Sequence, residues 1–253
     1  MDLQLAGRSA LVTGASSGIG RGIVKALAAE GVRTVAVARR RDLLESLAEE
    51  VAAAGHPRPG LVLGDLTTPG GPEGAAQEAL RLAGGRIDIL VNNAGQSHPV
   101  TWQSDDEVWT HSMELNFHAP RRLAQALIPA MKAAGWGRIL TVTGGQELAA
   151  SNAASAAKAA AQAWSKGLAA ELGRDGITVN CVVPGRINSE QILNRLHPDE
   201  AEREAFIQRA IPLGYFGEPA DFAAMVAFLA SPLARYVTGE AIRVDGGMLK
   251  FAH

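Results

Sequence analysis

The stretch Thr13-Gly14-Ala15-Ser16-Ser17-Gly18-Ile19-Gly20 decides how this chain folds. It follows a short apolar run and leads into an apolar helical pattern at about residues 18–30. In such a strand-loop-helix, the first glycine permits a tight turn, the second admits a pyrophosphate and the third lets helix pack on strand. The helix N-terminus offers unpaired N–H groups and a positive dipole end to phosphates. The stretch therefore predicts a dinucleotide-binding loop of Gly14, Ser16, Ser17, Gly18, Ile19 and Gly20.

Outward from this loop, short apolar runs alternate with longer helical patterns along the 253 residues. Strands are expected at 10–12, 32–38, 61–63, 87–91, 138–143, 177–183 and 241–244, and helices at about 18–30, 41–54, 71–84, 105–132, 151–173 and 219–230. This alternation predicts an α/β fold, a single Rossmann-type doubly wound parallel sheet of seven strands with helices on both faces, in one domain over residues 1–253. Residues 188–212 break the alternation and carry Pro198 and several charges, so we expect an inserted helical flap that covers a site.

Composition excludes several classes of function. The net charge is −2 and the basic residues are dispersed, which argues against nucleic-acid or anionic-membrane partners. One cysteine and six scattered histidines predict no internal disulfide and no metal site. No signal-like N-terminus and no uninterrupted apolar segment of 18 residues is present, so a cytoplasmic location is expected.

The end of the second expected strand predicts the cofactor. Ala38-Arg39-Arg40-Arg41 lies about 18 residues past the last loop glycine, where a dinucleotide fold places the residue that reads the adenosine ribose. An acidic residue there would favour a free 2′-hydroxyl, whereas a guanidinium suits a 2′-phosphate. Arg39 and Arg40 therefore predict NADP(H) over NAD(H), against the alternative that the arginines form a solvated helix start.

Further motifs follow in order along nearly the whole chain: Asp65 after the third strand, Asn92-Asn93-Ala94-Gly95 after the fourth, Pro184-Gly185-Arg186-Ile187 after the sixth, and Tyr236-Val237-Thr238-Gly239 with Asp245-Gly246-Gly247 near the end. With the glycine loop, this series resembles the short-chain dehydrogenase/reductase family. The resemblance implies further cofactor contacts from Asp65, Leu66, Asn92, Ala94, Gly95, Pro184, Gly185, Ile187 and Ser189. Among these, Ile187 and Ser189 match the positions that hold the nicotinamide carboxamide.

The catalytic part of the family pattern is incomplete. Members use a Tyr as proton donor, a Lys that lowers its pKa, a Ser that holds the substrate oxygen and an Asn that continues a proton relay. The resemblance places the Asn at Asn116 and the Lys at Lys158, which also holds the nicotinamide ribose. It places Ala154 at the Tyr position and Gly144 at the Ser position. Both direct contacts with the substrate oxygen are therefore expected to be missing.

Other residues are candidates for the missing acid. The loop after Gly144 is short, so its register leaves Ser151, Asn152 or Ser155 as residues that could face the site instead. Thr143, Gln146 and Glu147 follow the fifth strand, His98 follows the fourth, and His197 lies on the flap. A histidine is the most capable of these as a general acid, although each has the alternative of ordinary loop polarity.

Three functions remain open at this point. The first is an NADP(H)-dependent oxidoreductase that transfers hydride to or from a ketone or 3-oxoacyl-like carbonyl with a non-standard proton donor. The others are a non-redox cyclase, isomerase or lyase, and a catalytically silent nucleotide-binding or assembly protein. The substrate is expected to be a small molecule under an apolar lid of Ile192, Leu193, Leu196 and Phe206, with Trp102 and Trp109 opposite. The alternative is that these apolar residues belong to the core. The resemblance further implies a homodimer or homotetramer.

Overall fold

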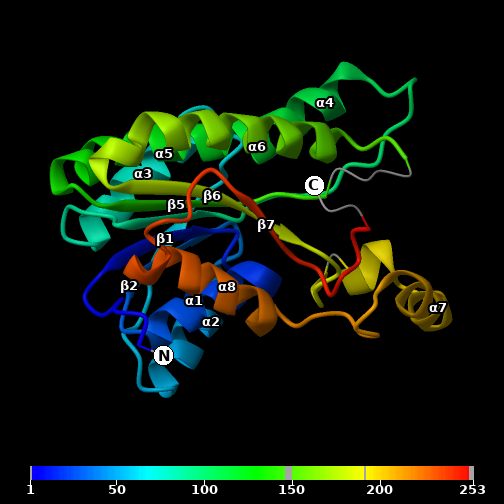
Figure 1. Ribbon diagram of the computed structural model, residues 1–253, viewed down its shortest axis with the longest axis horizontal. Coiled ribbons are helices and arrows are strands. Elements are labelled where there is room, and N and C mark those ends of the chain that lie inside the picture. Colours follow the sequence, from blue (N-terminus) through cyan, green and yellow to red (C-terminus); the bar gives the residue numbers. More distant parts are fainter. Residues whose placement is uncertain (1, 146–149, 191, 251–253) are drawn as a thin grey trace.

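A computed structural model describes residues 2–145, 150–190 and 192–250. Within these residues, seven parallel strands form one sheet in the order β3-β2-β1-β4-β5-β6-β7, as the sequence predicts (Figure 1). The strands are β1 (Ser9–Thr13), β2 (Arg33–Ala38), β3 (Gly60–Leu63), β4 (Ile89–Asn92), β5 (Gly137–Val142), β6 (Ile177–Pro184) and β7 (Ala241–Val244). Strands of a covered parallel sheet are buried on both faces, which is why the central ones are continuous apolar runs.

Helices cover both faces of the sheet (Figure 1). One layer holds α1 (Gly18–Ala29), α2 (Arg41–Ala53) and α8 (Pro219–Ala230), and the other holds α3 (Gly71–Leu82), α4 (Asp106–Met113), α5 (Ala119–Ala134) and α6 (Ala153–Leu172). Leu27 and Phe222 are fully buried in the first layer, and Leu123 and Leu127 in the second. Full burial of each such side chain contributes roughly 1.5–3 kcal/mol.

The expected helix at 105–132 is interrupted in the structure. A π-helix, Glu114–His118, separates α4 from α5. Pro120, at the start of α5, has no N–H for the carbonyl four residues earlier, which belongs to Asn116. A π-turn is wider than an α-helical turn and can accommodate the missing hydrogen bond. The apolar pattern of the sequence does not show this turn, so periodicity alone predicted one continuous helix.

The flap (residues 188–212) contains the π-helix Ile192–Leu196 and α7 (Glu200–Ala210), which lies outside the two helical layers (Figure 1). The Asp199 side chain caps α7 by accepting from Glu202 N at 2.8 Å. Two main-chain hydrogen bonds close the base of the flap, from Asn188 N to Gly217 O (2.8 Å) and from Gly217 N to Arg186 O (2.9 Å). The two ends of the segment that contains the flap thus lie side by side, and Leu213 N, just beyond the flap, donates to Gly246 O at 3.2 Å.

Candidate active site

The strand register brings the loops after four strands to one edge of the sheet. Val12 of β1 pairs with Val91 of β4, and Val142 of β5 pairs with Val182 of β6. The glycine loop therefore emerges beside Asn93–Gly95, with the ends of β5 and β6 next to them. Ligands of open parallel sheets bind beyond this edge, where neighbouring strands lead into opposite layers.

A cavity of about 360 Å³, the loop cavity, lies beyond β1, β2 and β3. Arg40 borders it and points back to the glycine loop, with Nη2 2.8 Å from Ser17 Oγ and 3.4 Å from Ser16 Oγ. Its Nη1 donates to Glu190 Oε2 at 2.8 Å. The predicted Gly14, Ser16, Ser17, Arg39, Arg40, Asp65, Leu66, Ala94 and Gly95 all border this cavity. Two guanidinium groups and two hydroxyls thus converge on a space large enough for a ligand.

Asp65, which follows β3, also borders the loop cavity. Its carboxylate accepts from Thr67 N (2.9 Å) and Thr67 Oγ1 (2.7 Å), and Arg39 Nη1 lies 3.8 Å away. The hydrogen bond from Thr67 N, followed by the Thr67 hydroxyl and the Arg39 charge, lowers the pKa of Asp65. Asp65 therefore stays ionised and keeps Arg39 at the rim.

The glycine loop has no room for side chains at two positions. Gly14 has φ +64°, and a Cβ there would lie 2.9 Å from the Ala94 Cα. A Cβ at Gly20 would lie 2.3 Å from the Gly14 carbonyl oxygen. Helix α1 therefore packs directly on the loop that it follows, as the spacing of the glycines predicted.

One residue of the fourth-strand motif lies elsewhere than expected. Asn92 Nδ2 faces Pro120 O at 3.5 Å, and Asn92 is not among the described residues that border either cavity. Its neighbour Asn93 borders the site and donates from Nδ2 to Thr13 O (2.9 Å) and Gly14 O (3.2 Å). Successive strand residues point to opposite faces, so only one asparagine can face the glycine loop.

A second cavity of about 580 Å³, the central cavity, continues the groove beyond β4, β5 and β6. The helix α6 presents Ala154 and Lys158 to it, and the loop after β5 presents Thr143 and Gly144. From the predicted cofactor set it is bordered by Gly14, Ser17, Gly18, Ile19, Ala94, Gly95, Pro184, Gly185, Ile187 and Ser189. The two cavities share the glycine loop, so one elongated ligand can occupy both.

Lys158 is partly buried at the floor of the central cavity. Its Nζ donates to Thr143 O at 3.3 Å, and its Cδ lies 3.5 Å from the position of a Cβ at Gly144. Burial lowers the pKa of Lys158 to about 8. The ammonium therefore exchanges its proton within an ordinary range of pH.

Asn116 lies on the π-helix behind Gly95. A Cβ at Gly95 would be 2.8 Å from Asn116 Oδ1 and 3.8 Å from Lys158 Nζ, so both polar groups approach the same point. Asn116 Oδ1 accepts from Gln96 N at 3.3 Å, and its Nδ2 donates to Ser112 O at 3.0 Å. π-turns inside helices frequently occur at functional sites, and this one places Asn116 behind Gly95. Gly95 borders the central cavity, whereas Asn116 is not among the described residues that border it.

Comparisons with known proteins agree with this geometry. A family model described as Enoyl-(Acyl carrier protein) reductase matches residues 14–249. The 3-oxoacyl-[acyl-carrier-protein] reductase FabG of Escherichia coli (strain K12) is 38% identical over 251 residues, which cover 96% of this chain and 97% of that protein. Galactitol 2-dehydrogenase (L-tagatose-forming) of Cereibacter sphaeroides is 36% identical over 253 residues, 96% of each protein. This chain belongs to the short-chain dehydrogenase/reductase family.

A solved structure gives the same answer for the short-chain dehydrogenase/reductase fold. L-sorbose reductase from Gluconobacter frateurii, complexed with NADPH and L-sorbose, superposes with a TM-score of 0.93 at 36% identity, covering 99% of this chain and 100% of that one. All three relatives are named as reductases or dehydrogenases. They favour the oxidoreductase over the non-redox and the catalytically silent alternatives.

The short-chain dehydrogenase/reductase framework leaves few of the candidate acids at the central cavity. Thr143 borders it, and its hydroxyl accepts from Gln162 Nε2 at 2.9 Å. His98 was expected to border the substrate, but its ring turns toward α4, with Nδ1 3.1 Å from Ser112 Oγ. It is absent from the described residues that border the central cavity. Its backbone explains this orientation, because His98 O accepts from Ala153 N at the start of α6.

Of the remaining candidates, Ser151 and Ser155 border the central cavity as the sequence allowed, whereas His197 and Asn152 are engaged elsewhere. His197 accepts from Arg186 Nε at 3.0 Å and packs 4.6 Å from the Phe206 ring. Burial, followed by the charges of Arg186 and Arg203, lowers the pKa of His197, so the ring is neutral near pH 7. Asn152 Oδ1 caps α6 by accepting from Ala154 N. Gln146 and Glu147 lie outside the described residues.

The expected apolar lid is only partly at the central cavity. Ile192 and Leu196 border it, whereas Leu193 faces the opposite side of the flap beside α1 and α8. The expectation for the two tryptophans is wrong in the described residues, because neither Trp102 nor Trp109 borders the cavity and Trp102 is 91% exposed. Met248 and Leu249, which the sequence did not single out, complete the apolar wall from the C-terminal segment.

Proposed function

We propose that this chain is an NADP(H)-dependent oxidoreductase that reduces a ketone or 3-oxoacyl-type carbonyl. The observation that carries the proposal is the groove formed by the two cavities. At one end Arg39, Arg40, Ser16 and Ser17 offer cationic and hydroxyl donors, and at the other end Lys158 offers an ammonium. This is the distribution of charge that a phosphorylated dinucleotide and a carbonyl substrate require.

The residues of the groove fit the cofactor. The 2′-phosphate is assigned to Arg39, Arg40 and the serine hydroxyls, and the pyrophosphate to the glycine loop and the N-terminus of α1. The nicotinamide end is assigned to Ile187 and Ser189, with Pro184 and Gly185 beside them. When bound, the cofactor supplies the hydride. The protein supplies position, a wall that excludes water, and a proton.

The substrate class rests on the relatives and on the wall of the central cavity. FabG is named for 3-oxoacyl-[acyl-carrier-protein], and the solved reductase holds L-sorbose, so both named substrates carry a ketone. The wall here combines the apolar Ile192, Leu196 and Met248 with the polar Ser155 and Gln96. A ketone with one apolar substituent fits this lining, and the flap is proposed to close over it.

Two measurements test the proposed function. Quenching of protein fluorescence should show NADPH binding at least about tenfold tighter than NADH, because each charge-assisted hydrogen bond to the 2′-phosphate contributes roughly 1.5–3 kcal/mol. Loss of absorbance at 340 nm should then follow NADPH oxidation with a panel of 3-oxoacyl thioesters, ketoses and cyclic ketones. Equal binding of NADH would overturn the cofactor, and turnover of a substrate without nucleotide would overturn hydride transfer.

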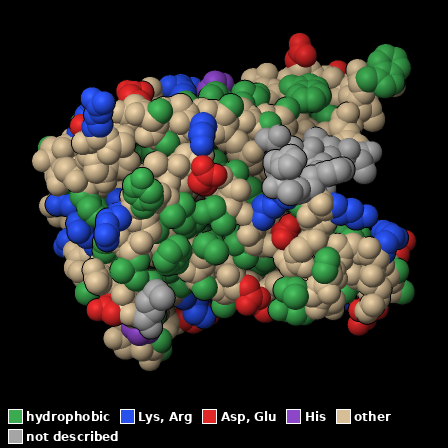
Figure 2. Space-filling model, in the orientation of Figure 1, with side chains coloured by type: hydrophobic (Ala, Val, Ile, Leu, Met, Phe, Trp, Pro, Cys, Tyr) green, Lys and Arg blue, Asp and Glu red, His purple; other side chains and the backbone are tan. Residues whose placement is uncertain are grey.

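We also propose that the chain assembles as a homodimer or homotetramer. The edge strand β7 has no strand partner on its outer side in the described sheet, and hydrophobic side chains gather over β7 and α8 (Figure 2). Such an edge is usually covered. In the described residues, no helix combines the length and apolarity needed to cross a membrane. Light scattering after size exclusion should give a mass of two or four chains, and a mass of one chain would overturn the assembly.

A further inference from the structure

Among the described residues that border the central cavity, one charged side chain keeps N–H donors that are free to contact a ligand. Of the described residues that border it, three carry ionisable side chains: Lys158, Arg186 and Glu190. Arg186 Nε is committed to His197, and a guanidinium does not release a proton in this range of pH. Glu190 is held at the loop cavity by Arg40. Among these ionisable groups of the described residues, only Lys158 faces the cavity with a proton that it can transfer.

We propose that Lys158 is itself the catalytic proton donor to the substrate oxygen. The inference rests on the proposed function and deepens it, because it names the non-standard donor. The side chain of Lys158 reaches the cavity floor between Gly144 and Gly95, neither of which has a side chain to shield it. Ala154, one helical turn earlier, contributes only a methyl group.

The hydrogen bonds of Lys158 leave the capacity that a donor needs. An ammonium has three N–H donors, and one of them goes to Thr143 O at 3.3 Å. Among the ion pairs of the described residues, none includes Lys158. Two donors are therefore left for ligands in the cavity, such as a ribose hydroxyl and the carbonyl oxygen. A carboxylate partner would have held the proton on nitrogen.

The proton balance of the step is simple. As the carbonyl carbon gains the hydride, the π electrons of the C=O bond move onto the oxygen. That oxygen takes a proton from Lys158 Nζ, so an alcohol forms and Lys158 is left as a neutral amine. The amine then regains a proton from solvent before the next turnover. The NADPH of the proposed function is the only reductant.

The surroundings of Lys158 support this role. The described loops after β4 and β5 and the π-helix present Gly95, Gly144, Asn116 and the Thr143 carbonyl, none of which titrates. Burial alone brings the pKa of Lys158 to about 8. A general acid is most effective when its pKa lies near the working pH, and such groups contribute about 10²–10⁴ in rate. A lysine whose pKa is about 8 is thus a competent proton donor.

Chemical rescue tests the proposal directly. Lys158→Ala should lower kcat for carbonyl reduction by about 10²–10⁴-fold. Methylammonium added to this variant should raise its kcat at least about tenfold. The rescued kcat should change with the acidity of the added amine. Tetramethylammonium carries the same charge without a proton and should restore nothing. Equal rescue by both cations would overturn the donor role in favour of a charge that only positions the ligands.

A second variant keeps the test valid if Lys158→Ala folds poorly. Lys158→Arg keeps the charge but cannot give up a proton, so it should retain NADPH binding and lose kcat. In the wild type, kcat should fall tenfold per pH unit above about pH 8, because only the ammonium can donate. The matched control Lys166→Arg, on the exposed face of the same helix, should keep the wild-type profile. An unchanged profile in Lys158→Arg would overturn the proposal while leaving the reductase intact.

A measurement without cofactor separates this inference from the proposed function. Nitrogen NMR of the Lys158 ammonium in the free protein should give a titration midpoint near pH 8, and Lys158→Arg identifies the signal. A midpoint above about 10 would overturn Lys158 as the acid even in an active reductase. Absence of NADPH oxidation with every carbonyl, despite a midpoint near 8, would overturn the reductase itself and with it the donor role.

Discussion

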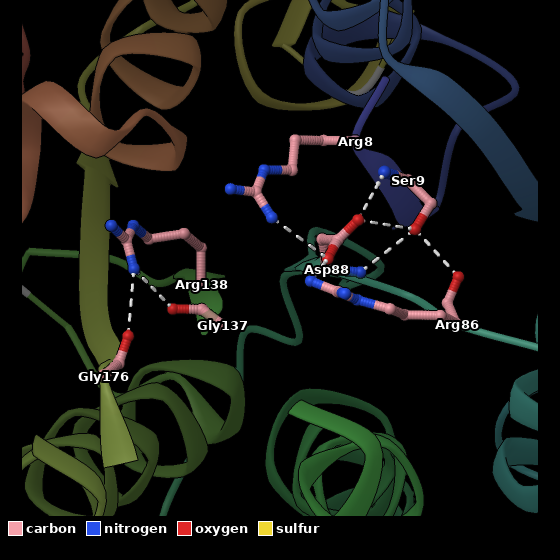
Figure 3. Close-up of polar contacts among 7 residues, drawn as sticks. All are labelled: Arg8, Ser9, Arg86, Asp88, Gly137, Arg138 and Gly176. Carbon is pink, nitrogen blue, oxygen red and sulfur yellow. Dashed lines mark hydrogen bonds and ion pairs between the residues drawn. The ribbon is translucent and has the colours of Figure 1, made fainter. Parts of the chain in front are cut away.

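The amino and carboxyl ends of the strands differ in how their charged side chains are partnered. At the amino end of β5, Arg138 is 2% exposed, and its guanidinium donates to Gly137 O (2.8 Å) and Gly176 O (3.3 Å) (Figure 3). It also donates to Ser231 O at 3.4 Å. The guanidinium carbon of Arg138 lies 4.3 Å from the centre of the Trp136 ring. Burial, followed by the Arg8 charge, lowers the pKa of Arg138 to about 10. The side chain stays charged and ties three segments together.

A buried carboxylate completes the amino end. Asp88 Oδ2 accepts from Ser9 N at 2.9 Å, Arg8 Nη1 lies 3.6 Å from Oδ1, and Arg86 forms a closer ion pair with the same carboxylate (Figure 3). At the carboxyl end, by contrast, the described residues give Lys158 one carbonyl partner, and they give the exposed Arg40 two serine hydroxyls and the exposed Glu190. Charges at the amino end are partnered within the chain, whereas those at the carboxyl end keep donors for ligands.

The largest expected effect is on the amino end. Arg138→Ala should lower the free energy of unfolding by about 3 kcal/mol, because it removes buried side-chain packing and leaves three carbonyls without their donor. Urea denaturation measures this, with the exposed Arg174→Ala as the matched control. NADPH affinity should change less than twofold. A loss of stability below about 1 kcal/mol would show that Arg138 does not hold the segments together.

Lys158→Met should act in the opposite direction and raise the free energy of unfolding at pH 7 by about 2–3 kcal/mol, since a unit of pKa corresponds to about 1.4 kcal/mol. The folded-state pKa of Lys158, about 8, lies below its ordinary 10.5, so the unfolded chain binds the extra proton between these values. The wild type should therefore gain stability relative to the variant as pH rises from 8 to 10.5. A constant difference in the free energy of unfolding between wild type and variant across that window would contradict this.

Arg40→Ala should weaken NADPH binding by about 10–50-fold while leaving NADH within twofold, because the lost hydrogen bonds go to the 2′-phosphate alone. Fluorescence titration with both nucleotides measures the ratio. Arg41→Ala is the matched control, since Arg41 is the next residue and pairs with Glu45 on α2. Equal losses for both nucleotides would assign Arg40 to the pyrophosphate instead.

The smallest effect is expected from Glu190→Gln, which removes the carboxylate that competes for Arg40. NADPH should bind about two- to fivefold tighter, because exposed ion pairs contribute about 1 kcal/mol or less. The gain should shrink in high salt. Glu45→Gln, which breaks the comparable Arg41 pair, is the control. Weaker binding in Glu190→Gln would mean that Glu190 contacts the cofactor itself.

Much of the fold and of the loop cavity was predictable because it depends on local patterns. The apolar runs of the strands, the three loop glycines and the arginines after β2 act through backbone and neighbours close in sequence. Family membership confirmed the resemblance carried by Asp65 and Pro184–Ile187. The break between α4 and α5 was not predicted, although Pro120 is a local signal for it in the sequence.

The rest depends on contacts between distant residues. Arg40 and Glu190 lie 150 positions apart, and no local pattern links them. His98 turns away because its main chain bonds to the start of α6, and Asn93 replaces Asn92 because of the pleat of β4. The low pKa of Lys158 follows from burial alone, which a sequence does not display. The resemblance to the family therefore located α6 and Lys158, but not the donor role that we propose for this lysine.

The two hydrogen bonds that close the base of the flap have a consequence for how new specificities arise. Gly217 bonds to both Arg186 and Asn188, so the two ends of the segment that contains the flap lie side by side. A change of sequence or length between these ends therefore acts first on the wall of the central cavity that Ile192 and Leu196 form. It acts on the rest of the fold through two further contacts, Glu190 with Arg40 and Leu213 N with Gly246 O.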